Sequence, residues 1–176
     1  MAKSALIVGG TRGIGRATAN LLLNRGWKVS AVGRKGFDIH VTNPQRFIGN
    51  YDAFIFCAGD VRVAGSLAFD YPIAFYQIAQ YMPINCIIIA ISSVAADRSA
   101  KSNPHYAAAK AALESYARTL KFSSRATQFN WRVETIRFDL VTTQMMDQLP
   151  ASEKFEGREI IDQEEEARRI VERICP

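Results

Sequence analysis

Residues 5–15 of the chain read ALIVGGTRGIG, and this stretch decides the fold. Its apolar start, Ala5–Val8, predicts a short buried strand, and the following segment Gly13–Arg25 carries apolar residues at helical spacing. A glycine-rich turn between a strand and a helix lets the backbone approach a pyrophosphate. The helix N-terminus then offers free N–H groups and the positive end of its dipole. A lone glycine motif is a weak signal, but the strand before it and the helix after it supply the confirming context.

The rest of the chain repeats this alternation of apolar runs and helical segments. Most runs are short and apolar without strict alternation, as in strands that are buried on both faces of a parallel sheet. We therefore expect one α/β domain over residues 1–176, a doubly wound parallel sheet of about six strands with helices on both faces. The expected strands are Ala5–Val8, Lys28–Val32, Ala53–Phe56, Asn85–Ile91 and Arg132–Phe138. The expected helices are Gly13–Arg25, about Tyr71–Tyr81, about Pro104–Phe122, and Gln163–Ile174.

The segment between Val32 and Ala53 is too short for the usual pattern. A full βαβ crossover needs a dozen or more residues, and two crossovers with an extra strand do not fit there. We expect a stub strand near Phe37–Ile39, a single helical turn around Pro44–Ile48, and the loss of at least one crossover helix.

Length and composition exclude several classes of protein. The chain has 176 residues, of which 48% are hydrophobic and 22% charged, which suits a globular domain and excludes a disordered chain. No uninterrupted apolar run is longer than Cys86–Ile91, which is far shorter than the roughly 20 residues of a membrane-spanning helix. We expect no signal peptide, no membrane partner and a cytoplasmic location.

The chain is basic overall, with a net charge of +5. The basic excess lies within residues 1–150, whereas residues 151–176 carry more acidic than basic side chains. Such an excess fits nucleic acid, an anionic surface, a phosphorylated ligand or scattered solvated lysines, and composition alone does not choose between them. The three cysteines show no paired spacing, and only two histidines could join them, so we expect free thiols and no metal site.

A set of polar residues follows the fourth expected strand. Ser93 lies 13 positions before Tyr106, and Lys110 lies one helical turn after Tyr106 on the same face. A free phenol has a pKa of about 10, which is too high for efficient proton exchange at neutral pH. A neighbouring ammonium favours the ionised phenol, so we expect Lys110 to lower the pKa of Tyr106 and make it a usable general acid or base. The hydroxyl of Ser93 could hold a carbonyl oxygen while hydride arrives at the carbon.

The glycine loop and this Ser–Tyr–Lys set together resemble the short-chain dehydrogenases/reductases. The G-x-x-x-G-x-G spacing of residues 9–15 is similar to the cofactor loop of that family. Ser93 with Tyr106-x-x-x-Lys110 is similar to its catalytic triad. The resemblance implies a Rossmann-type fold in which Ser93 orients the carbonyl and Tyr106 transfers the proton. It also implies that Lys110 lowers the pKa of Tyr106 and bonds the nicotinamide ribose.

Further segments extend the resemblance over nearly the whole chain. Phe56–Gly59 is similar to the family's Asn-Asn-Ala-Gly element, and Arg132–Met145 is similar to the segment that closes over nicotinamide. By this resemblance the cofactor-binding residues are Gly9, Thr11, Arg12, Gly13, Ile14, Gly15, Arg34, Lys35, Cys57, Ala58, Gly59, Tyr106, Lys110, Val141 and Thr143.

The chain also departs from the family pattern. Phe56 and Cys57 replace the two asparagines, and Phe138-Asp139 replaces a Pro-Gly pair. His40 stands where an adenine-contacting Asp is usual. Asp70 stands where the family's catalytic Asn lies, so we count it as a fourth candidate catalytic residue with an altered proton relay.

The sequence ends soon after the last expected helix, where the family usually adds another strand and a dimer-forming tail. We therefore expect a fold that is truncated at the C-terminus, with about six strands rather than seven. We expect no tetramer built through the missing edge, and a homodimer stays open.

Cofactor choice follows from the residues after the second expected strand. Dehydrogenases that prefer NAD place an Asp or Glu there to bind the ribose 2′-hydroxyl. Here Gly33 takes that position and is followed by Arg34 and Lys35, while Arg12 lies in the glycine loop. Guanidinium groups bind phosphate bidentately, so NADP(H) is preferred over NAD(H). The alternative is that these cations are merely solvated.

The sequence is compatible with three functions. The leading hypothesis is an NADPH-dependent oxidoreductase that reduces a ketone, an aldehyde or a 3-oxoacyl group. An acyl-carrier-linked substrate is one option, because the segment from Tyr106 to Leu113 is similar to β-ketoacyl-carrier-protein reductases. The second hypothesis is a non-catalytic NADP(H)-binding or sensor protein. Nucleic-acid binding is the weakest of the three, because basic and aromatic residues are not interleaved.

Three further cations could face an anionic substrate or carrier, or be solvated: Arg62, Arg98 and Lys101.

Overall fold

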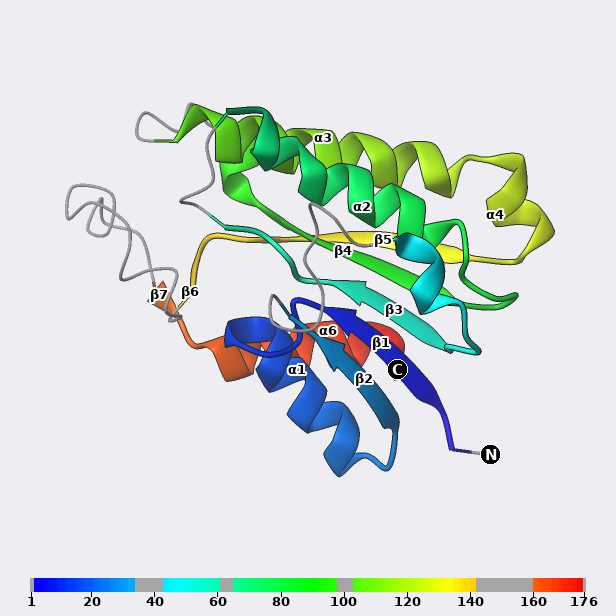
Figure 1. The fold of residues 1–176 in the computed structure, drawn as a ribbon. Coiled ribbons are helices and arrows are strands. Elements are labelled where there is room, and N and C mark those ends of the chain that lie inside the picture. The colour runs from blue at the N-terminus through cyan, green and yellow to red at the C-terminus, as the bar shows by residue number, and fades with distance from the viewer. Residues whose placement is uncertain (1, 34–42, 61–64, 98–102, 142–159, 176) are drawn as a thin grey trace.

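The computed structural model describes residues 2–33, 43–60, 65–97, 103–141 and 160–175. Within them a parallel five-stranded sheet has the strand order β2-β1-β3-β4-β5. Helices α2, α3 and α4 cover one face of the sheet, and α1 and α6 cover the other (Figure 1). The strands are β1 (Ser4–Val8), β2 (Lys28–Val32), β3 (Ala53–Phe56), β4 (Ile87–Ser93) and β5 (Arg132–Phe138). The helices are α1 (Gly13–Asn24), α2 (Asp70–Ala79), α3 (Pro104–Lys121), α4 (Ser124–Gln128) and α6 (Gln163–Ile174).

This architecture confirms the doubly wound parallel α/β fold. Short 3-10 helices connect the larger elements: η1 (Pro44–Phe47), η2 (Gly65–Phe69) and η3 (Val94–Ala96). A separate parallel pair, β6 (Leu140–Val141) with β7 (Ile160–Ile161), lies beyond the end of β5 (Figure 1).

The short connection from β2 to β3 contains the expected helical turn. This turn is η1, which begins after Asn43, whose side chain accepts a hydrogen bond from the Gln45 N–H at 2.9 Å. No α-helix occurs among the described residues of this connection, and the stub strand expected near Phe37–Ile39 lies outside them.

The start of β4 differs from the sequence prediction by two residues. The expected strand began at Asn85, whereas β4 begins at Ile87. Asn85 has a φ of +61°, in the left-handed region, and its N–H donates to the Phe129 carbonyl at 2.8 Å. An Asn tolerates this conformation better than most residues, so it forms a turn that enters the strand.

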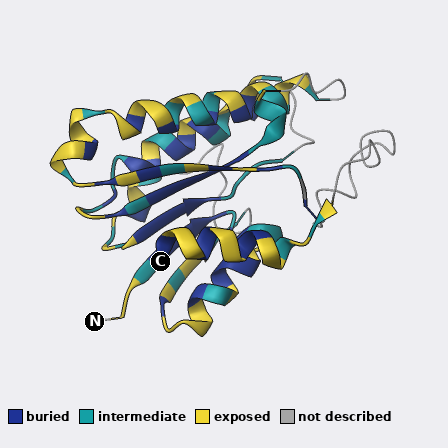
Figure 2. Cartoon of the chain, turned by 180° about the vertical axis from the view of Figure 1, so that it is seen from behind, coloured by how far each residue is buried: buried dark blue, intermediate teal, exposed yellow. Residues whose placement is uncertain are grey.

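The apolar runs become the buried middle of a three-layer molecule. Every residue of β3 is buried, and the central strands lie between helices whose outer faces are exposed (Figure 2). Alternate residues of each strand point to opposite faces, so Phe54 and Phe56 enter one hydrophobic cluster and Ile55 the other. β2 lies at one edge of this sheet, next to β1, and its residues are exposed or only partly buried.

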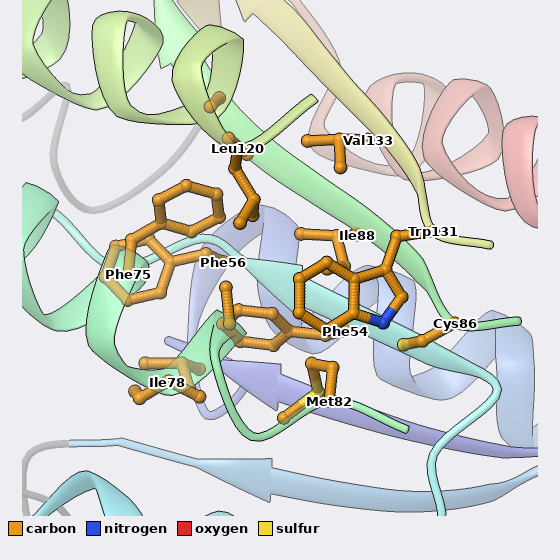
Figure 3. Close-up of a cluster of buried hydrophobic side chains, with 14 of the residues drawn as sticks. Phe54, Phe56, Phe75, Ile78, Met82, Cys86, Ile88, Leu120, Trp131 and Val133 are labelled. Carbon is orange, nitrogen blue, oxygen red and sulfur yellow. The ribbon is translucent and has the colours of Figure 1, made fainter. Parts of the chain in front are cut away.

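Three phenylalanine rings hold the sheet to α2. Phe75 stacks on Phe54 with ring centroids 5.9 Å apart and meets Phe56 edge to face at 5.6 Å (Figure 3). Aromatic pairs in such arrangements contribute beyond the area they bury. This cluster anchors α2 and the β3 end, which both reach the candidate site.

The strand order locates the ligand-binding edge. β1 pairs with both β2 and β3. After β1 the chain enters α1 on one face of the sheet, whereas after β3 it leads to α2 on the opposite face (Figure 1). In doubly wound sheets ligands bind at the carboxyl ends of the strands where the winding reverses. Here that point lies between the end of β1 at Val8 and the end of β3 at Phe56.

The aromatic cluster gives a stability prediction. Phe75→Ala should lower the free energy of unfolding by about 3–5 kcal/mol, because it leaves a cavity against two buried rings. Phe122→Ala is the matched control, since Phe122 is 78% exposed and should change stability little. Urea denaturation of both variants measures the difference, and equal losses would contradict the assignment.

Candidate active site

The glycine loop packs so closely that side chains do not fit at key positions. The N–H groups of Gly9 and Gly10 donate to the Val32 carbonyl at 2.8 and 3.0 Å. Gly9 has a φ of +85°, and a Cβ there would lie 2.7 Å from the backbone nitrogen of Ala58. A Cβ on Gly15 would lie 2.3 Å from the Gly9 carbonyl oxygen. The loop is therefore bare backbone pressed against the end of β3.

Helix α1 begins directly behind this loop. Arg12 is its N-cap in an extended conformation, and no side-chain cap hydrogen bond is found there among the described residues. The first turn also holds no acidic residue, so its N–H groups and the positive helix end can meet an anion. Gly13 at the first position of the helix has a φ of +52°. The predicted cofactor residues of this loop, Gly9 and Thr11–Gly15, thus lie together.

The chain beyond β3 joins the loop to the catalytic residues. The Cys57 N–H donates to the Val8 carbonyl at 2.8 Å, which continues the pairing with β1. A Cβ on Gly59 would lie 3.2 Å from the Lys110 Nζ and 3.9 Å from a ring carbon of Tyr106. The predicted residues Cys57, Ala58 and Gly59 therefore form a backbone bridge between the two halves of the site.

Ser93 and Tyr106 are brought together by a strand end and a helix start. Ser93 is the last residue of β4 and caps η3, where its Oγ accepts from the Ala95 N–H at 3.2 Å. Asn103 caps α3 by accepting from the Tyr106 N–H at 2.9 Å, which fixes the first turn of that helix. The Ser93 side chain lies close enough to the Tyr106 phenol to lower its pKa. The predicted spacing thus brings these two side chains together.

Lys110 is a buried cation beneath the tyrosine. Its side chain is buried on α3, and Nζ donates to the Ile91 carbonyl at 2.8 Å. The same Nζ lies 5.7 Å from the centre of the Tyr106 ring. Burial lowers the pKa of Lys110 to about 8, although the nearby Cys57 and Glu114 act in the opposite direction.

The pKa of Tyr106 differs from the sequence expectation. Burial raises the pKa of its phenol to about 12, and the neighbouring Ser93 side chain opposes that rise. We expected Lys110 to lower this pKa, but in the structure desolvation of the phenolate outweighs other influences. The phenol therefore holds its proton at neutral pH.

A small recess lies on the α2 side of this pair. It is lined by Tyr71 and Pro72 of α2, by Asp60, and by the side chains of Tyr106 and Lys110. Asp70, the fourth candidate catalytic residue, is the first residue of α2 and precedes the two lining residues. Its catalytic role stays a prediction.

The remaining candidate residues are only partly placed. Val141 lies in β6 and is buried against the cluster on the α1 and α6 face. Phe138, at the position of the family's proline, is buried, with the Arg169 guanidinium 5.4 Å from its ring centre. The candidates that lie outside the described residues are Arg34, Lys35, His40, Arg62, Arg98, Lys101 and Thr143. The described residues contain no group of three or more His, Cys, Asp or Glu placed to hold a metal ion.

Three charged residues next to the site were not identified from the sequence. Arg137 at the end of β5 binds both Asp97 and Glu114. The one available signal was the position of Glu114, which follows Lys110 by four residues on the same helix face.

Sequence models identify the family. The model described as enoyl-(acyl carrier protein) reductase matches residues 73–173, and the model described as short chain dehydrogenase matches residues 3–68. The chain belongs to the short-chain dehydrogenase/reductase family of NAD(P)-dependent oxidoreductases. No curated protein matches the sequence.

Solved structures share the fold at low sequence identity. The 3-alpha-hydroxysteroid dehydrogenase from Pseudomonas sp. B-0831, complexed with NADH, is 18% identical with a TM-score of 0.79, over 99% of this chain and 90% of that one. The TT0495 protein from Thermus thermophilus is 21% identical with a TM-score of 0.79, over 100% and 92%. A small-chain dehydrogenase in complex with NADPH is 20% identical with a TM-score of 0.77, over 100% and 92%.

The buried lysine predicts a pH dependence of stability. Its pKa falls from 10.5 to about 8 on folding, so above pH 8 the folded chain binds fewer protons than the unfolded chain, and stability rises with pH. Cys57 and Cys86 act oppositely, because burial raises their thiol pKa values from 9.0 to about 12 and stability falls above about pH 9. Between pH 8 and 9 we expect Lys110 to raise the free energy of unfolding by about 1 kcal/mol, of which the two thiols offset about 0.7 kcal/mol.

Chemical denaturation in small pH steps measures this rise. It should be absent in Lys110→Met, which removes the titrating group. If Lys110→Met shows the same rise, another group titrates and the assignment to Lys110 is wrong.

Proposed function

We propose that the chain is a single NADPH-dependent catalytic domain that reduces a carbonyl group to an alcohol through Ser93, Tyr106 and Lys110. One observation carries this proposal: the Ser93 side chain acts on the Tyr106 phenol, and the centre of that ring lies 5.7 Å from the buried Lys110 Nζ. The pair also adjoins the glycine loop through the Gly59 backbone. A binding protein would not need a phenol in this environment.

A bound nicotinamide cofactor would supply the hydride, and the chain's own residues handle the oxygen and its proton. The Ser93 hydroxyl, at the end of β4, holds the carbonyl oxygen beside the phenol. Tyr106 is protonated at neutral pH because its pKa is raised, and it donates this proton as negative charge develops on that oxygen. Lys110 keeps its charge below about pH 8 and stabilises the phenolate that forms.

The end of β2 supports NADP(H) as the cofactor. A Cβ on Gly33 would lie 2.0 Å from the Thr11 Oγ1, so an acidic side chain there would have to displace Thr11. Without a carboxylate at Gly33, a 2′-phosphate meets no repulsion. The cations Arg12, Arg34 and Lys35 are then available to bind it.

The substrate is proposed to be a ketone, an aldehyde or a 3-oxoacyl group. The match of residues 73–173 to a model described as enoyl-(acyl carrier protein) reductase supports the acyl-carrier option. The second candidate function is a non-catalytic NADP(H) sensor, which the altered Asn and Pro-Gly elements favour.

We also propose a cellular location and the partners of the chain. The described residues include no helix that is long and apolar enough to cross a membrane. All three cysteines are described and are free thiols, which supports the reducing cytoplasm. We propose no nucleic-acid or membrane partner, and a homodimer stays open.

Replacing the phenol tests the catalytic assignment. Tyr106→Phe should lower kcat for carbonyl reduction by at least about 100-fold while NADPH binding persists, because only the proton donor is lost. Tyr116→Phe is the matched control on the same helix, where the ring packs against Tyr76 at 5.1 Å. NADPH oxidation is followed with ketones, aldehydes and 3-oxoacyl thioesters. If the wild-type chain binds NADPH but turns over none of them, the sensor function replaces the enzyme.

Cofactor preference is tested at Arg34. Arg34→Gln should weaken NADPH binding by about tenfold or more and leave NADH binding nearly unchanged, because a charge-assisted hydrogen bond to the 2′-phosphate is lost. Arg25→Gln, at the exposed C-cap of α1, serves as the control for general charge. Titration of each variant with both cofactors gives the ratio, and equal wild-type affinities for NADH and NADPH would refute the preference.

A further inference from the structure

Arg137 connects two acidic side chains that belong to different elements. Its Nε donates to the Glu114 Oε1 at 2.7 Å, and its two terminal nitrogens bind Asp97 as well as the second Glu114 oxygen. Both carboxylates are thus held by two hydrogen bonds each, a geometry that fixes orientation as well as distance. Exposed ion pairs usually contribute little to stability, but a network of bidentate pairs is an exception.

The two acidic residues lie on the segments that carry the proposed catalytic groups. Asp97 directly follows η3, the short helix that Ser93 caps. Glu114 lies one turn beyond Lys110 on α3. Arg137 itself pairs with Ser92 in the register of β4 and β5, which lie beneath α3 (Figure 1). The guanidinium therefore joins the segment after Ser93 to the helix that bears the tyrosine and the lysine.

The network also governs the charge near Lys110. The groups that face this ammonium are Cys57 after β3, the Ile91 carbonyl of β4, Tyr106 and Glu114 of α3, and Asp60 and Tyr71 of the recess. The Glu114 side chain is only 12% exposed, and its charge raises the pKa of Lys110. Because Arg137 binds both Glu114 oxygens, it offsets this negative charge and holds the carboxylate away from the lysine.

We propose that Arg137 is a positioning residue that locks the Ser93 segment against α3 and keeps Glu114 from pairing with Lys110. This inference rests on the proposed function for its catalytic consequence. The network itself is independent of which substrate is reduced.

Arg137→Met tests the proposal. We expect kcat for carbonyl reduction to fall about tenfold with little change in KM. The alkaline limb of the pH profile should move upward by roughly half a pH unit to one unit, because the freed Glu114 favours the charged lysine. Arg137→Lys keeps the positive charge but loses the paired hydrogen bonds that the guanidinium makes to each carboxylate. It should therefore restore the pH profile and only part of kcat. Arg132→Gln is the matched control on the same strand, with a side chain 46% exposed against 42% for Arg137.

A second variant and a direct titration complete the test. Glu114→Gln should move the pKa of Lys110 downward, opposite to Arg137→Met, even if the latter folds poorly. NMR titration of ¹³C-labelled lysine side chains reads the Lys110 pKa in the chain alone, so it decides the proposal even if no carbonyl is reduced. Unchanged Lys110 titration in both variants, or an equal loss of kcat in Arg132→Gln, would overturn it.

Discussion

The structure depends on one close contact, where the glycine loop meets the end of β3. Gly9 and Gly15 leave no room for a Cβ, so the loop's backbone lies directly against Ala58 and its neighbours. This contact occurs where the winding of the sheet reverses, and it sets the first turn of α1 beside the carboxyl edge. Gly59, one residue further, extends the same backbone surface to Lys110. The proposed cofactor and catalytic regions are therefore built on the same few peptide units.

The buried ammonium of Lys110 is a costly feature of the site. Burial of a charge opposes folding, and the hydrogen bond to the Ile91 carbonyl offsets only part of this cost. Its lowered pKa shows that the folded chain holds the charged form less firmly than water does. A site that needs a cation next to a phenol retains this destabilised group. Stability and proposed activity therefore make opposite demands at Lys110.

Most strands and helices could be predicted from the sequence because their bounds depend on residues that are close together along the chain. The bounds of β2, β3, β5 and α6 match the expected ranges, since each is an apolar or amphipathic run with clear ends. Asp162 caps α6, and its side chain accepts from the Glu164 N–H at 2.8 Å. The start of β4 was predicted wrongly, because the apolar run conceals a turn at Asn85 that depends on its contact with Phe129.

The sequence by itself determined the succession of strands and helices along the chain, the glycine-rich loop, and the one-turn spacing of Tyr106 and Lys110. Each of these follows from residues that are neighbours in the sequence. Tertiary structure alone decided the electrostatics of the site. Burial raises the pKa of Tyr106, where the sequence had suggested a lowering, because desolvation depends on everything packed around the ring. The Arg137 network joins residues 23 and 40 positions apart in sequence. Such contacts exist only once β5 is placed beside β4 and beneath α3.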